Sequence, residues 1–194
     1  MKHRAIPALM LAVAGAFAQT RVPLEPVGTK QSAEKIRGLF SPLQCDREGN
    51  VYLRALGPGE KARSAMRTIR KFDRQGVLKA KFAFEASPEI AELDPFGFAV
   101  GPVGEIYVAA EGQDGDYIAT FDRDGKYRSK VKLELAFRPS QIAVFKSGDF
   151  LVSGVEFREQ NGKRIGAPLT AIFDGRGKLL RKVSVKGRVS TAQD

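Results

Sequence analysis

The feature of this sequence that most constrains its fold is an internal repeat of about fifty residues. Two short phrases alternate along the chain, three times each. The first is an apolar residue, a polar turn, a glycine and a β-rich segment, at residues 45–53, 100–108 and 144–152. The second is Phe-Asp-x-x-Gly, at residues 72–76, 121–125 and 173–177. Corresponding glycines are 44 to 55 residues apart, which indicates a repeated supersecondary unit with loops of unequal length.

Each phrase is typical of a β-hairpin. An aspartate at the first turn position can accept a hydrogen bond from the backbone two residues on, and glycine three positions later tolerates positive φ. Residues 131–135 alternate apolar and charged side chains, as a strand with one face in water does. Residues 106–110 and 150–152 are nearly continuous apolar runs, so we expect those strands to be covered on both faces.

Two hairpins per repeat give a four-stranded antiparallel unit, which is the description of a propeller blade. We therefore predict an all-β, propeller-like fold with three blades at about residues 40–86, 94–136 and 139–187. A helical fold is excluded because no long stretch has apolar residues at helical spacing. Only residues 32–39 and 88–93 have the composition of single helical turns.

Three blades do not close a ring, because closed propellers have about four to eight. The predicted ring is therefore incomplete. Three explanations remain: the chain is part of a longer gene product, it associates with itself to complete the ring, or it forms an open arc. Truncation is the explanation we favour from the sequence, with self-association second, because an open arc exposes apolar strands.

The N-terminus has the pattern of a signal peptide over residues 1–18. A basic start, Met1-Lys2-His3-Arg4, is followed by an apolar run over residues 5–17 and by Ala16-Phe17-Ala18 as a cleavage pattern. A helix of that run reaches only about 20 Å, less than the ~30 Å of a hydrocarbon core, so an export signal is favoured over an anchor. We expect export to the periplasm or beyond the cell, with residues 19–39 as a linker and 40–194 as the partial propeller.

Two single residues bear on chemistry. The one histidine of the chain, His3, lies in the predicted signal peptide. The mature chain then cannot use Ser-His-Asp or Cys-His catalysis, and it has no imidazole for a zinc or iron site. Cys45, the one cysteine, aligns in the repeat with Val100 and Val144. We therefore predict a buried thiol at Cys45 rather than a bridge between two chains.

The chain is basic, with 32 Lys and Arg against 22 Asp and Glu and a formal charge of +10. The first repeat holds a cluster of cationic side chains: Arg54, Lys61, Arg63, Arg67, Arg70, Lys71, Arg74, Lys79 and Lys81. We interpret them as solvated outer faces that keep a β-protein soluble and protect strand edges. The alternative is contact with an anionic envelope surface, such as lipid headgroups or acidic glycans. Nucleic acid is not an expected partner, because of the export signal and because no aromatic-basic RNA-binding phrase is present.

The candidate binding residues are acidic: Glu111, Asp114 and Asp116 in one loop, and Glu156 at a comparable place in the third repeat. Carboxylates at one end of a propeller channel can bind a cation or a basic partner, and the alternative is a solvated hairpin loop. The stretch 122–125 does not fit a calcium loop. Position twelve of such a loop would be Leu133 instead of a bidentate glutamate, and the flanks are strands.

At two places the chain resembles a known family. Gly49-Asn50-Val51-Tyr52-Leu53 and Phe121-Asp122-Arg123-Asp124-Gly125-Lys126 are similar to the phrases of NHL-repeat and related six-bladed β-propellers. That group includes the gluconolactonase/regucalcin-like enzymes, and the resemblance extends over nearly all of the mature chain. It implies the propeller fold. In the gluconolactonase-like members Glu, Asn and Asp ligands hold a divalent metal, and that ligand set does not map onto this chain residue by residue.

These observations predict an exported, non-catalytic propeller-type protein that presents loops to a protein or glycan, with no catalytic residue and no resident cofactor. The alternative is a metal-dependent hydrolase of lactonase type, which would use carboxylates alone around a divalent cation. The absence of histidine from the mature chain favours the binding protein, since fold by itself does not confer a function.

Overall fold

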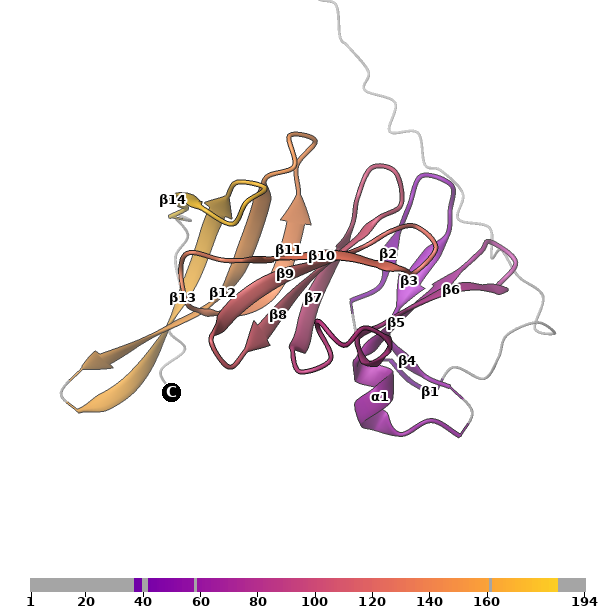
Figure 1. The fold of residues 1–194 in the computed structure, drawn as a ribbon, viewed down its shortest axis with the longest axis horizontal. Coiled ribbons are helices and arrows are strands. Elements are labelled where there is room, and N and C mark those ends of the chain that lie inside the picture. The colour runs from indigo at the N-terminus through magenta and orange to yellow at the C-terminus, as the bar shows by residue number, and fades with distance from the viewer. Residues whose placement is uncertain (1–36, 40–41, 58, 161, 185–194) are drawn as a thin grey trace, which may run out of the picture.

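The computed structural model describes residues 37–39, 42–57, 59–160 and 162–184 of the 194-residue chain. It is all-β, with three four-stranded antiparallel sheets that follow one another along the chain (Figure 1). This confirms the predicted fold class, including a ring that is not closed. The predicted signal peptide and residues 19–36 of the predicted linker lie outside the described residues. Among those described, no helix is long and apolar enough to cross a membrane.

Each sheet is built from four strands in sequence order. Sheet 1 contains β2 (Gln44–Cys45), β3 (Val51–Leu53), β5 (Thr68–Phe72) and β6 (Leu78–Ala83). Sheet 2 contains β7 (Asp94–Val100), β8 (Ile106–Gly112), β9 (Gly115–Phe121) and β10 (Tyr127–Lys132). Sheet 3 contains β11 (Arg138–Val144), β12 (Phe150–Gln160), β13 (Lys163–Phe173) and β14 (Leu179–Lys182).

Smaller elements lie at the edges of sheet 1. Strand β1 (Arg37–Leu39) pairs with β4 (Ala55–Leu56), and helix α1 (Ala62–Met66) lies in the connection from β3 to β5. A 3-10 turn, η1 (Phe84–Ala86), follows β6. The helical turn predicted at residues 32–39 is wrong at its described end, which is strand β1. Residues 88–93 form turns, and α1 was missed because five residues are too few to show helical periodicity.

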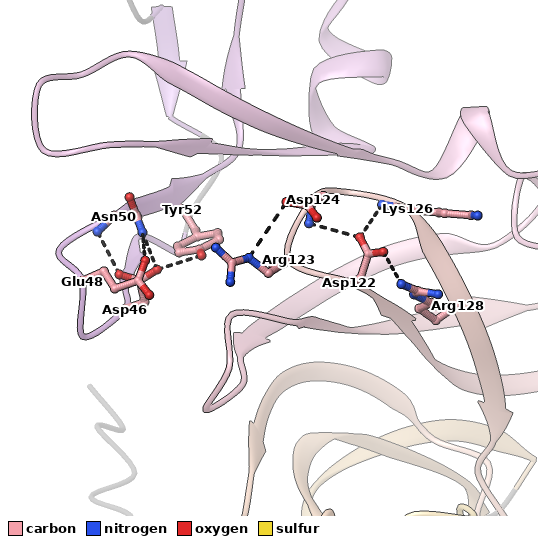
Figure 2. Close-up of polar contacts among 9 residues, drawn as sticks. All are labelled: Asp46, Glu48, Asn50, Tyr52, Asp122, Arg123, Asp124, Lys126 and Arg128. Atoms are coloured by element: carbon pink, nitrogen blue, oxygen red, sulfur yellow. Dashed lines mark hydrogen bonds and ion pairs between the residues drawn. The ribbon is translucent and has the colours of Figure 1, made fainter.

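The repeated phrases form the predicted hairpin turns. All six repeat glycines have φ between 78° and 93°. Asp122 Oδ1 accepts the N–H groups of Asp124 and Lys126 at 3.1 and 2.9 Å (Figure 2). Asp174 does the same at its own turn, and the backbone N–H groups of Lys178 and Arg176 hold the pKa of that carboxyl below its usual value. Because strand directions alternate, all six turns lie at one end of the sheets, which we call the turn end; the opposite end is the loop end.

Successive sheets stack face to face around two apolar cores. The first core lies between sheets 1 and 2, where the Phe82 and Phe121 rings meet edge-on with centroids 6.1 Å apart. The second lies between sheets 2 and 3, where Phe137 and Phe173 stack at 6.0 Å. The first strands of neighbouring sheets, β2, β7 and β11, lie next to one another. In the described chain no fourth four-stranded sheet packs on the outer face of sheet 1 or of sheet 3 (Figure 1). On the outer face of sheet 1, Leu53 and Phe72 are nonetheless buried, in a small cluster with Ala55 of β4.

The prediction that Cys45 is buried is wrong, because its thiol is exposed. Cys45, Val100 and Val144 do occupy equivalent positions, each paired with the first residue of the next strand. Val100 packs on the first core and Val144 on the second. Their shared face points toward the preceding sheet, and sheet 1 has no preceding sheet among the described residues.

The interpretation of the basic cluster as solvated faces is wrong for four of its nine members. These four side chains are buried: Arg54, Arg67, Arg70 and Lys71. Arg70 donates to the Ala55 carbonyl and pairs with Glu60. The Lys71 ammonium lies 5.6 Å from the centroid of the Tyr52 ring. Their long apolar stems cover neighbouring side chains while their charged ends reach polar or aromatic partners, which makes their burial tolerable.

Candidate functional site

Two of the four candidate residues come together at the loop end. Glu111 on β8 and Asp116 on β9 are cross-strand partners whose side chains contact the start of β11. Asp116 is 5% exposed and accepts the Phe137 N–H at 2.8 Å, while Glu111 pairs with Arg138 at 3.1 Å. Burial raises the pKa of Asp116, and the Glu111 carboxylate raises it further. The Phe137 N–H and the Arg138 guanidinium lower the pKa of Asp116, but by less.

The other two candidates have separate partners. Asp114, at the tip of the β8–β9 hairpin, accepts the Tyr117 hydroxyl at 2.8 Å and pairs with Lys132 at 3.0 Å, and these two groups lower its pKa. Glu156 on β12 pairs with Lys182 at 3.1 Å and with Arg158, and both cations lower its pKa. Within the described ranges, no three His, Cys, Asp or Glu side chains group closely enough to hold a metal ion.

The most prominent feature of the loop end is a hairpin that sequence analysis missed. Strands β12 and β13 are eleven residues long and extend past the rest of sheet 3 (Figure 1, lower left). We call their projecting parts, residues 156–160 and 163–167, the arm. These residues pair with each other, whereas pairing with β11 ends at Val155 and pairing with β14 begins at Ala171. No described strand pairs with the outer edges of the arm.

Apolar and cationic side chains cover the arm. The Phe157 ring is 37% exposed and lies over Gly166, where a Cβ atom would come within 3.5 Å of it. The guanidinium carbons of Arg164 and Arg138 lie 4.2 and 5.7 Å from the ring centroid. Ile165 is 45% exposed. A sequence signal for the arm exists, because the two turn glycines are 29 positions apart in the third repeat and only 21 apart in the second.

Arg54 is a second feature of the loop end that the sequence did not indicate. It is 5% exposed between sheets 1 and 2, donates from Nη1 to the Phe96 carbonyl, and lies 5.6 Å from the Phe98 ring centroid. Its Nε and Nη2 have no hydrogen-bond partner among the described residues. Burial lowers its pKa to about 10, because the charged form is poorly solvated there.

At the turn end, polar side chains stabilise backbone turns. Asp46 accepts the Asn50 N–H at 2.9 Å and the Tyr52 hydroxyl at 2.9 Å (Figure 2). Asp122 pairs with Arg128 at 2.7 Å in addition to its backbone bonds, so its oxygens are occupied within the hairpin. The small cavity between these two turns and the β7–β8 turn, about 50 Å³, is large enough only for a few water molecules.

Comparison with known proteins gives likeness in fold only. No family model and no curated protein matches the chain. A protein of unknown function from Bacteroides caccae is 18% identical with a TM-score of 0.48, over 75% of this chain and 45% of that one. A catalytically inactive virginiamycin B lyase from Staphylococcus aureus with quinupristin is 14% identical with a TM-score of 0.43, over 82% of this chain and 58% of that one. The chain thus spans about half the length of these solved structures, and its likeness to NHL repeats stays a prediction.

Proposed function

We propose that this chain is an exported, non-catalytic binding protein of propeller type, which presents its loop end and the arm to a protein partner. The observation that carries the proposal is the arm, a two-stranded hairpin whose outer edges pair with no described strand and whose exposed Phe157 ring is approached by Arg138 and Arg164. The test described below must distinguish a protein partner from a glycan partner.

The backbone of the arm suits an extended polypeptide. A strand edge without a neighbour offers N–H and C=O groups to which a peptide can add as a further strand. Phe157 and Ile165 supply apolar area on the two faces, and the arginines supply charge-assisted donors. Aromatic and arginine side chains are also the types that carry most binding energy at protein interfaces. Specificity would come from these side chains and affinity from the shared backbone bonds.

The carboxylates of the loop end support binding more than hydrolysis. Glu111, Asp114 and Glu156 each form an ion pair with a lysine or arginine of the chain itself. Ion pairs that water reaches contribute little to stability, because solvent screens the two charges. They can therefore open toward a charged partner at little cost.

The test is a random-peptide display selection beside a glycan array, both on the purified chain. We expect selected peptides to lose about tenfold or more in affinity for Phe157→Ala, which is ~1.4 kcal/mol or more. Phe145→Ala is the matched control, because Phe145 is 44% exposed in the β11–β12 turn at the opposite end. Peptide binding that is equal in both variants, or glycan binding that depends on Phe157, would refute a protein partner at the arm.

The alternative, a metal-dependent hydrolase, rests on Glu111 and Asp116. These two residues are cross-strand partners, and the pKa of Asp116 is raised. Elemental analysis of the purified protein separates the two functions. A stoichiometric divalent metal that is lost in Glu111→Gln and Asp116→Asn would replace the binding proposal with the hydrolase. Peptide binding by metal-free protein supports the binding proposal.

A further inference from the structure

The two strands of the arm differ in charge. On β12 the arm contains two carboxylates, Glu156 and Glu159, together with Arg158. On β13 it contains two cations, Lys163 and Arg164, and no acidic side chain. Neither of these cations forms an ion pair with a carboxylate among the described residues, and the contact of Arg164 is with an aromatic ring. The β13 edge of the arm is therefore the one that attracts a negatively charged partner.

The backbone of β13 directs alternate residues toward this edge. Its pairing with β12 is regular, without a bulge, so the N–H and C=O groups of successive residues point alternately toward β12 and away from it. The Thr170 carbonyl points away from β12, because it accepts the Val183 N–H at 2.7 Å. Arg164 and Gly166 are in phase with Thr170 and direct their backbone groups to the open edge. Pro168 is also in phase but has no N–H, so the usable edge is confined to the arm.

The side chains beside this edge offer one apolar and one cationic neighbour to an added strand. Gly166 has no side chain, and the ring of its cross-strand partner Phe157 lies over it, within 3.5 Å of where a Cβ atom would be. The Arg164 guanidinium carbon is 4.2 Å from the centroid of that ring, on the same face. A residue opposite Gly166 would therefore lie beside the ring, and a residue opposite Arg164 would lie beside the cation.

We propose that the β13 edge of the arm binds an extended acidic segment of the protein partner as an added antiparallel strand. The inference rests on the proposed function of the arm and specifies which edge is used and what sequence is recognised. All strand pairs of the described chain are antiparallel, which is the commoner arrangement in proteins. In this arrangement Arg164 and Gly166 each exchange two backbone hydrogen bonds with the residue opposite.

The antiparallel direction fixes the order of the recognised residues. Because the added strand runs against β13, its residue opposite Gly166 comes two positions before its residue opposite Arg164. Aromatic and β-branched residues pair well beside an aromatic ring, and opposite charges pair well across strands. The recognised pattern is therefore an aromatic or β-branched residue, then any residue, then aspartate or glutamate.

The β12 edge fits such a segment less well. Phe157 and Glu159 are the cross-strand partners of Gly166 and Arg164, so they direct their backbone groups to the β12 edge. An acidic strand added there would place a carboxylate near that of Glu159. Like charges directly opposite each other destabilise a strand pair. The β12 edge therefore selects against the segment that the β13 edge selects for.

The first test measures charge and position with peptides selected by display on the full chain. We expect the pattern above to be enriched among them. A selected peptide should bind Arg164→Gln about threefold or more weakly, and replacing its acidic residue by the amide should remove this difference. Arg158→Gln is the matched control, an exposed arginine of the same arm whose side chain lies on the opposite face, and it should bind as the unsubstituted chain does.

The second test examines the backbone and leaves the protein unchanged. N-methylation of a selected peptide at the residue opposite Gly166 should lower its affinity about tenfold, because it removes a hydrogen-bond donor that faces β13. N-methylation of the next residue, whose N–H points away from β13, should have little effect. Equal losses at the two positions would overturn the added strand.

The outcomes separate this inference from the proposed function. Peptides that depend on Phe157 but lack the acidic pattern, or that respond equally to Arg164→Gln and Arg158→Gln, would overturn the acidic strand and leave peptide binding by the arm intact. A selection that yields no peptide would refute both. Residues 185–194 lie outside the described residues and follow β14 in the sequence. A peptide that binds only a chain ended at Ser184 would show that the chain itself occupies this edge, and would overturn the inference.

Discussion

At the scale of single residues, two turn glycines share a backbone conformation but have different surroundings. Gly76 and Gly177 have φ of 78° and 83°. A Cβ atom on Gly76 would meet nothing within 4 Å, whereas one on Gly177 would lie 2.1 Å from the Lys132 carbonyl oxygen. The Gly177 carbonyl also accepts the Glu134 N–H at 2.9 Å. Gly177 therefore closes a turn and also allows sheet 3 to approach the backbone after sheet 2.

This difference predicts unequal costs for the same substitution. Gly76→Ala should lower the free energy of unfolding by about 1–2 kcal/mol, the cost of positive φ for a residue with a side chain. Gly177→Ala should cost more, because the methyl group also displaces the backbone at Lys132. Urea unfolding followed by circular dichroism measures both. Equal losses would show that the close approach is not rigid.

At the scale of elements, the connection from sheet 1 to sheet 2 is held by one buried arginine. Arg67, just before β5, donates to the Ala91 carbonyl and pairs with Asp94 at 3.0 Å and Glu85 at 3.7 Å. The Arg67 side chain is 8% exposed, while Asp94 is 75% exposed. Water can solvate the Asp94 carboxylate if the ion pair is lost, but it cannot take the place of the buried Arg67 side chain.

We expect Arg67→Ala to lower the free energy of unfolding by about 2–3 kcal/mol, because a charge-assisted bond and the packing of the stem are lost together. Asp94→Ala should cost less than about 1 kcal/mol, since an exposed carboxylate contributes little. Urea unfolding of the two variants compares them directly. A larger loss for Asp94→Ala would contradict the assignment of the connection to the arginine.

At the scale of the whole molecule, stability is concentrated where two sheets face each other. Phe121 is fully buried among Phe82, Phe84 and Tyr127, with ring centroids 5.6 to 6.1 Å apart. Phe72 is its counterpart on the outer face of sheet 1 and belongs to a much smaller cluster. The central sheet therefore contributes to both large cores, and each outer sheet contributes to one of them.

Phe121→Ala should lower the free energy of unfolding by about 3–5 kcal/mol, because it leaves a cavity in the larger core. Phe72→Ala should cost less, because the cluster around Phe72 is much smaller. Urea unfolding followed by circular dichroism compares the two losses, and a larger cost for Phe72→Ala would be the contrary result.

The features that could be predicted from the sequence are local. An aspartate, a glycine and the apolar residues on either side specify each hairpin within about ten residues, and so the six turns and the three sheets were correctly predicted. Glu111, Asp114 and Asp116 were predicted in one loop, but only Asp114 lies in the turn, while Glu111 is on β8 and Asp116 is on β9. The pairing of Glu111 with Asp116 required knowledge of the β8–β9 register. The arm was missed because its strands continue the ordinary pattern and differ only in length.

The tertiary structure alone decided which residues are buried, because burial depends on which sheet lies opposite a residue. Cys45 and Val100 have the same place in the repeat, and Cys45 is exposed because sheet 1 has no preceding sheet among the described residues. Arginine is a residue type usually found at the surface, yet Arg54 is buried because sheet 2 packs over it. Turns and strands are specified by neighbours in sequence, whereas burial is specified by contacts between sheets that are tens of residues apart.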